Sequence, residues 1–95
     1  MICELLEKAE GCAAGKGGSM HMIAKGVGFT GTTPILGSLA SIAAGSAFEQ
    51  KRNQKRDITV AYIEDGAFEQ CGVYETLNLA ALFKLPLLIV LENHL

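Results

Sequence analysis

Several common sequence signals are missing from this chain of 95 residues. Its cysteines, Cys3, Cys12 and Cys71, form no Cys-x-x-Cys pair, and their odd number argues against a disulfide framework. The longest apolar stretch near the C-terminal end is interrupted by Pro86, and it is far shorter than the roughly 20 residues of a membrane-spanning helix. No secretory signal is recognisable. These absences predict reduced thiols, a cytoplasmic location and no membrane partner.

Charge is also sparse, because charged residues make up 19% of the chain and the formal net charge is -2. The single basic run, residues 51–56, has no interleaved aromatic side chains and matches no nucleic-acid motif. Nucleic acid is therefore not an expected partner. The run is interpreted as the solvated end of a helix, where cations complement the helix dipole.

Apolar and small residues are abundant by contrast, since the chain is 49% hydrophobic and contains 11 glycines. This composition is apolar enough to bury a core and unlike that of a disordered protein. The length allows one domain, so residues 1–95 are expected to form a single, partial domain. A domain of this size leaves about a third of its surface exposed, which makes a homo-oligomer a reasonable expectation.

The spacing of apolar residues predicts the secondary structure. Helices are expected over residues 2–9, 36–54 and 67–83, and strands over residues 57–63 and 87–91. Glycines in residues 10–33 predict a long loop, and Pro34 is expected in the first turn of the following helix. The order strand, helix, strand predicts a parallel βαβ unit in an α/β fold. The apolar strands are expected to be buried on both faces.

Polar residues follow both predicted strands, at the sheet edge where open parallel sheets bind ligands. The sequence reads Glu-Asp-Gly-Ala at residues 64–67 and Glu-Asn-His at residues 92–94. A carboxylate at Asp65 can ligate a hard divalent cation. The N–H groups of Gly66 and Ala67, at the start of a helix, can bind a phosphate. The pattern predicts a metal and diphosphate site, although an ordinary Asp-Gly turn is an alternative reading.

A longer motif begins at the same aspartate. From Asp65 the chain reads Asp-Gly-Ala-x(7)-Glu-x-x-Asn-x-Ala-Ala-Leu-x-x-Leu-Pro-x(5)-Glu-Asn. Upstream, residues 11–22 read Gly-Cys-x-x-Gly-Lys-Gly-Gly-Ser-Met-His-Met, and residues 35–37 read Ile-Leu-Gly. In this order they resemble the thiamine-diphosphate motif, the glycine-rich loop and the Ile-Val-Gly segment of one family. That family is the alpha subunits of pyruvate, branched-chain 2-oxo-acid and acetoin dehydrogenases, and the resemblance spans nearly the whole chain.

The resemblance implies a partial thiamine-diphosphate-binding fold and a part in the oxidative decarboxylation of a 2-oxo acid, with acyl transfer to lipoamide. It implies that Asp65 ligates magnesium and that Gly66 and Ala67 contact the diphosphate. The main-chain carbonyl of Leu36 would lie near the aminopyrimidine. In this family a beta-type subunit supplies the glutamate that activates the aminopyrimidine, and further cofactor contacts lie outside these 95 residues. A beta-type partner is thus implied, and no side chain here is predicted to be catalytic.

Several positions depart from the family pattern. Ala24 and Pro34 occupy positions that border the cofactor in this family, with Pro34 in place of a glycine. Glu64 replaces the first glycine of Gly-Asp-Gly and adds a negative charge where a diphosphate is expected. His94 replaces an asparagine that ligates magnesium, and imidazole suits zinc, nickel or iron better. His94 is therefore the second predicted metal-site residue, and weakened magnesium binding is expected.

These departures leave alternative functions open. The chain is either a truncated segment of a dehydrogenase alpha subunit, inactive alone, or a degenerate, non-catalytic module that oligomerises or binds a partner. Magnesium-dependent binding of thiamine diphosphate would favour the first, and stable oligomers without a cofactor response the second. A third alternative is a different phosphate ligand on the βαβ unit. A catalytic pair of Ser19 and His21 is not favoured, because no orienting acid lies nearby.

Overall fold

The computed structural model describes residues 1–94, which form helices, turns and a parallel sheet and so have the predicted α/β character. The contacts divide the chain into two compact units, Met1–Pro34 and Ile35–Leu95. Each unit has its own packing. The expected single domain over residues 1–95 stays a prediction.

The first unit contains little regular structure. Helix α1 spans Ile2–Leu5, and a 3-10 turn, η1, spans Lys25–Val27. The helix predicted over residues 2–9 is thus shorter than expected, because Glu7 has a left-handed φ of 55°. Between these elements the chain forms turns and bends, and an isolated antiparallel bridge joins Ala24 to Phe29.

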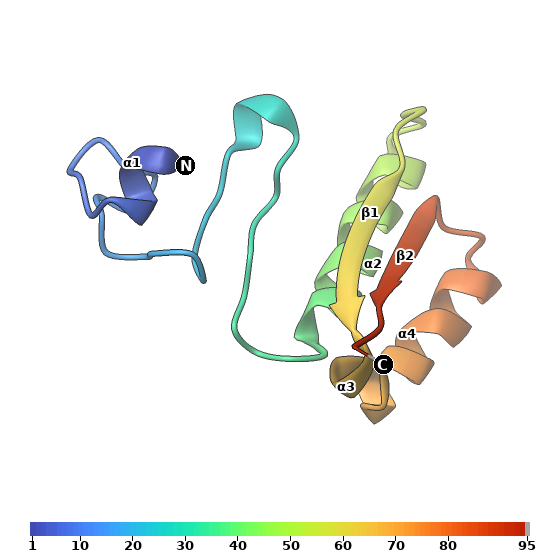
Figure 1. Ribbon diagram of the computed structural model, residues 1–95. Coiled ribbons are helices and arrows are strands. Elements are labelled where there is room, and N and C mark those ends of the chain that lie inside the picture. The colour runs from blue at the N-terminus through green and yellow to red at the C-terminus, as the bar shows by residue number, and fades with distance from the viewer. Residues whose placement is uncertain (95) are drawn as a thin grey trace. The chain divides into compact units, whose positions relative to one another are not determined.

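The second unit contains the sheet. Strands β1, Thr59–Glu64, and β2, Leu87–Glu92, run parallel, as predicted (Figure 1). Their register places Thr59 opposite Leu87 at one end and Glu64 opposite Glu92 at the other. Both carboxyl ends therefore lie at the same edge of the sheet.

Three helices accompany this sheet: α2 spans Ser38–Arg52, α3 spans Asp65–Phe68 and α4 spans Cys71–Leu82. The prediction of one helix over residues 67–83 was wrong, because Gln70 is extended, with ψ 138°, and separates α3 from α4. The prediction that Pro34 lies in the first turn of α2 was also wrong. The helix begins only after Gly37, which has a left-handed φ of 81°.

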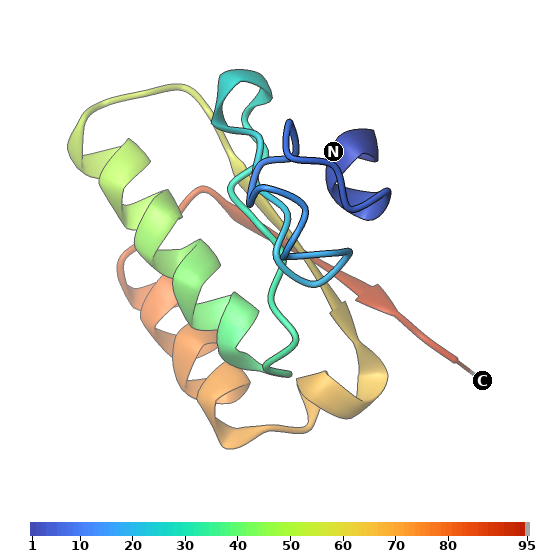
Figure 2. The same ribbon diagram turned by 90° about the vertical axis from the view of Figure 1, so that its left-hand side faces the viewer.

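The core of the second unit is built from small side chains. Helices α2 and α4 lie side by side and cover one face of the sheet (Figure 2). Alanines on α2 and β1 let helix and sheet approach closely, and larger apolar side chains such as Ile63 and Val73 complete the interior. The buried cluster consists of Ala40, Ala43, Ala61, Ile63, Ala67 and Val73.

The other face of the sheet is exposed in the described residues. Val60, Tyr62 and Leu88 have 42%, 61% and 50% of their surface exposed, whereas Ala61 and Ile63 are buried. The prediction that both faces are buried was therefore wrong for this chain. The reason is that α2 and α4 pack on the same face.

The basic run lies at the end of α2 and beyond it. Lys51, in the last turn, donates hydrogen bonds to the main-chain oxygens of Phe83 and Lys84, just after α4. It thus satisfies carbonyl groups that a helix end leaves without partners. Lys55 pairs instead with Glu49, and both side chains are about half exposed. No helix in residues 1–94 is long and apolar enough to cross a membrane.

Candidate metal and cofactor site

The carboxyl ends of β1 and β2 bring together residues that are distant in sequence (Figure 1). Glu64 and Glu92 are partners at the last position of the strand ladder. Asp65 begins α3, and His94 follows β2. The Nδ1 atom of His94 lies 3.0 Å from Oδ1 of Asp65. The two residues predicted to form a metal site therefore lie in contact. The side chain of His94 is 65% exposed and that of Asp65 is 48% exposed.

Hydrogen bonding and charge perturb both members of this pair. The hydrogen bond with His94 is the largest cause that lowers the pKa of Asp65, and burial opposes it. The same hydrogen bond, followed by the charge of Asp65, raises the pKa of His94. Glu64 and Glu92 raise the pKa of His94 further through their charges. Three carboxylates thus act electrostatically on one imidazole, so this edge attracts cations and repels an unaccompanied diphosphate.

The donor atoms at this edge fit magnesium only in part. The carboxylate of Asp65 is a hard oxygen ligand that suits magnesium. The imidazole of His94 suits transition metals such as zinc, nickel or iron better. Within residues 1–94, no three histidine, cysteine, aspartate or glutamate side chains form a group that could hold a metal ion. A cation bound here would need further ligands, such as water or phosphate oxygens.

Gly66 and Ala67 lie directly beside the pair. Ala67 is 3% exposed and belongs to the core, which fixes the start of α3 against the sheet. The position where Gly66 would carry a Cβ is open space. Because α3 has four residues, its dipole is small, and the main-chain N–H groups are what this segment offers an anion.

Three further residues were predicted to contact the cofactor: Ala24, Pro34 and Leu36. Leu36 precedes α2 in the second unit and is 53% exposed. Ala24 belongs to the first unit, where its N–H and carbonyl groups bond to Phe29. Pro34 ends the same unit. Proximity of these three residues to a cofactor stays a prediction.

Sequence reasoning missed Glu4. This residue has no exposed surface, and its carboxylate accepts hydrogen bonds from the N–H groups of Ala13, Gly15 and Gly17. These bonds, that of Ala13 first, lower the pKa of Glu4, and burial opposes them. A glutamate in a short amphipathic stretch usually lies on the protein surface. The only hint in the sequence is the glycine-rich segment nearby, whose N–H groups have no side chains to cover them.

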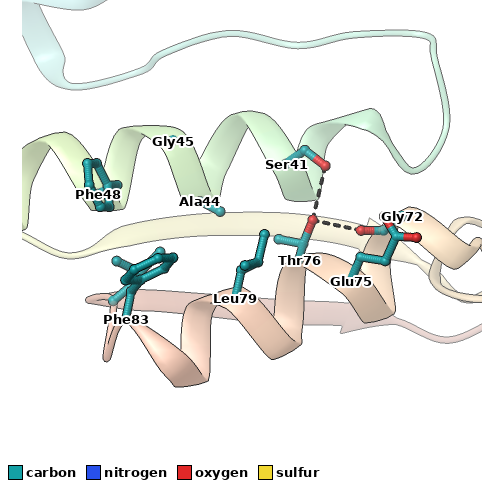
Figure 3. Close-up of a pocket in the computed structure, with 10 residues that line it drawn as sticks. Ser41, Ala44, Gly45, Phe48, Gly72, Glu75, Thr76, Leu79 and Phe83 are labelled. Atoms are coloured by element: carbon teal, nitrogen blue, oxygen red, sulfur yellow. Dashed lines mark hydrogen bonds between the residues drawn. The ribbon is translucent and has the colours of Figure 1, made fainter.

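A pocket of about 290 Å³ lies between α2 and α4 (Figure 3). The rings of Phe48 and Phe83 close one end, with centroids 5.8 Å apart. At the other end, Ser41 and Thr76 have hydroxyl oxygens 3.0 Å apart, and Thr76 donates to the carbonyl of Gly72 at 2.7 Å. Both hydroxyl groups are therefore already bonded, and the pocket is better described as an apolar groove between helices than as a reaction site.

Comparison with known proteins identifies the family. The model of the family described as "Dehydrogenase E1 component" matches residues 1–94. This chain belongs to that family. Over 94 residues it is 43% identical to the mitochondrial pyruvate dehydrogenase E1 component subunit alpha of Dictyostelium discoideum and 40% identical to the corresponding alpha subunit of Rickettsia conorii. The mitochondrial alpha subunit of Solanum tuberosum is 43% identical over 93 residues. The predicted resemblance to dehydrogenase alpha subunits is thus confirmed.

The matches cover almost all of this chain but only part of each relative. They include 99%, 99% and 98% of the chain, and 24%, 29% and 24% of the proteins from Dictyostelium, Rickettsia and Solanum, respectively. The chain therefore spans about a quarter of the length of these relatives. Two of the three are described as mitochondrial, so the cytoplasmic location stays a prediction.

Proposed function

We propose that this chain is the segment of a 2-oxo-acid dehydrogenase alpha subunit that holds the diphosphate of thiamine diphosphate together with a divalent cation. The observation that supports this role is the contact of Asp65 with His94 at the carboxyl ends of adjacent parallel strands. Ligands bind at such strand ends in open α/β sheets. Membership of the dehydrogenase E1 component family supports the cofactor class.

In this proposal each residue at the edge has a distinct role. Asp65 would supply a carboxylate oxygen to the cation, and His94 would be the second protein ligand. The N–H groups of Gly66 and Ala67 would bind the diphosphate. The cation would offset the repulsion between the diphosphate and the carboxylates at this edge. Thiamine diphosphate supplies the decarboxylation chemistry when bound, and the chain binds and orients it.

The other proposed contacts are Leu36, Ala24 and Pro34. The main-chain carbonyl of Leu36 would lie near the aminopyrimidine, and Ala24 and Pro34 would border the cofactor. A beta-type subunit is the proposed partner. The substrate proposed for the complete enzyme is a 2-oxo acid, whose acyl group passes to lipoamide. These roles derive from the family resemblance and from the order of the motifs in the chain.

A non-catalytic module that binds a partner or a second copy is the alternative function. The exposed apolar side chains of Val60, Tyr62 and Leu88 on one face of the sheet favour it. Parallel sheets are usually covered on both faces, so such a surface is typical of an interface. Light scattering after size-exclusion chromatography would measure whether the chain is a stable oligomer.

Calorimetric titration of thiamine diphosphate into the chain tests the proposed function. The titration is made with magnesium, with manganese and with EDTA, and Asp65→Asn serves as the matched variant. We expect cation-dependent binding with a Kd below about 1 mM, or roughly -4 kcal/mol, that is lost in Asp65→Asn. Absence of binding at several times that concentration, in a chain that forms stable oligomers, would support the alternative.

A further inference from the structure

We propose that the glycine-rich segment, residues 11–18, forms an anion-binding nest of main-chain N–H groups, and that Glu4 is the positioning residue that fills it. The carboxylate of Glu4 accepts hydrogen bonds from Ala13 at 2.7 Å, Gly15 at 3.1 Å and Gly17 at 2.6 Å. The N–H groups at these alternating positions converge on one carboxylate, and main-chain N–H groups that line a concavity are known to bind anions. The proposal concerns the first unit alone and does not depend on cofactor binding by the second.

The burial of Glu4 requires these hydrogen bonds. Its side chain has no exposed surface, and a buried carboxylate without partners would be strongly unfavourable. The ion pairs found in residues 1–94 are Lys55 with Glu49 and His94 with Asp65, so no cation accompanies Glu4 there. Main-chain N–H groups therefore stabilise its charge, as they do for bound phosphates.

Two glycines of this segment have a structural reason, and for one of them the reason is Glu4. A Cβ at Gly11 would overlap the Oε2 atom of Glu4. Gly15 has a left-handed φ of 76°, which side-chain-bearing residues rarely adopt. A glycine-rich segment would ordinarily suggest a cradle for a phosphate. Here the N–H groups that could bind a phosphate already donate to a carboxylate of the same chain.

Filling the nest also positions the turn that follows. At Gly17, a Cβ would lie 2.9 Å from the main-chain oxygen of His21 and 3.0 Å from its Cβ, so the two residues pack closely. The hydroxyl of Thr32 accepts a hydrogen bond from Met22 at 2.9 Å and donates one to the carbonyl of Ser19 at 3.1 Å. Glu4 thus fixes the turn at residues 19–22 from one side, and Thr32 fixes it from the other.

Chemical rescue by acetate tests the nest directly. The variant Glu4→Ala loses the Cγ atom and the carboxylate, and acetate has the same size and charge as the lost group. We expect the NMR signals of the N–H groups of Ala13, Gly15 and Gly17 to shift in this variant and to return with saturable, millimolar dependence on acetate. Sodium chloride at equal ionic strength should not restore them. The matched control is Glu10→Ala, a substitution of the exposed residue directly before this segment, in which these signals should not change.

Three outcomes would overturn the proposal: unchanged N–H signals in Glu4→Ala, a linear response to acetate, or an equal response to chloride. Should Glu4→Ala fail to fold, a pH titration of the unaltered chain decides. We expect the carboxyl carbon of Glu4 and the N–H signals of Ala13 and Gly17 to titrate together, below the ordinary glutamate pKa of about 4.3. Titration of the carboxyl carbon at that ordinary value, or without a response from the N–H signals, would contradict the nest.

Discussion

His94 and Asp65 form a hydrogen-bonded pair across the ends of neighbouring strands, 29 positions apart in sequence and with 3.0 Å between Nδ1 and Oδ1. The parallel register makes this contact feasible, because it aligns Glu64 with Glu92 at the last rung of the ladder. The residues that follow the two strands therefore leave the sheet side by side. The pair links the end of β2 to the start of α3, and it reports directly on the proposed cation site.

The first prediction concerns the pH dependence of this pair. Since the pKa of His94 is raised, its contribution to stability is present below the ordinary histidine pKa of about 6.5 and is lost as the pH rises through the raised value. Since the pKa of Asp65 is lowered, its contribution is present above about 3.9 and is lost as the pH falls through the lowered value. Asp65→Asn should lower the pKa of His94, as measured by NMR titration of the imidazole. The same pKa in both proteins would show that the pair does not form in solution.

The second prediction concerns the preferred cation. His94→Asn exchanges a nitrogen ligand for an amide oxygen, so it should shift selectivity from cobalt or nickel towards magnesium. We expect the ratio of the two affinities to change by about tenfold, measured by calorimetry in the presence of thiamine diphosphate. His21→Asn is the matched control, because the chain contains 2 histidines and His21 lies in the other unit. An equal change in both variants would mean that the cobalt or nickel binds without a defined site.

The third prediction compares two glycines on either side of the start of α2. Gly45 lies inside the helix with open space at its Cβ position, so Gly45→Ala should stabilise the second unit by about 0.5–1 kcal/mol. Gly37 has a φ of 81°, and a Cβ there would overlap the side chain of Gln70. Gly37→Ala should therefore destabilise the unit. Urea unfolding measures both effects, and a loss of stability in Gly45→Ala would contradict the helix packing described.

Much of the second unit could be predicted from the sequence. Strands β1 and β2 consist of β-branched and apolar residues between turn signals, and this local pattern is specific enough to predict the parallel pair. Asp65 and His94 could be placed at one edge because parallel strands end together. The helix boundaries were less predictable. The interruption at Gln70 depends on packing between segments, and helical periodicity alone does not reveal it.

The features that were missed depend on contacts between distant residues. Val60 and Tyr62 are exposed because α2 and α4 both lie on the other face of the sheet. The composition of the strands alone had suggested that both faces are buried. The burial of Glu4 depends on N–H groups up to 13 positions away. A single charged residue is ordinarily exposed, so the residue type of Glu4 predicts an exposed side chain rather than a buried one.

The last prediction compares neighbouring alanines of α2. Ala43 is 6% exposed and packs in the core, whereas Ala44 lines the pocket between α2 and α4. Ala43→Leu adds volume where the packing leaves no room, so it should lower the free energy of unfolding by about 1–3 kcal/mol. Ala44→Leu adds the same atoms towards a pocket of about 290 Å³, and its effect should stay within about 0.5 kcal/mol. Because helix propensity changes equally in both, urea unfolding isolates the packing term. Equal destabilisation in the two variants would mean that the pocket is filled in solution or that α2 is rotated about its axis.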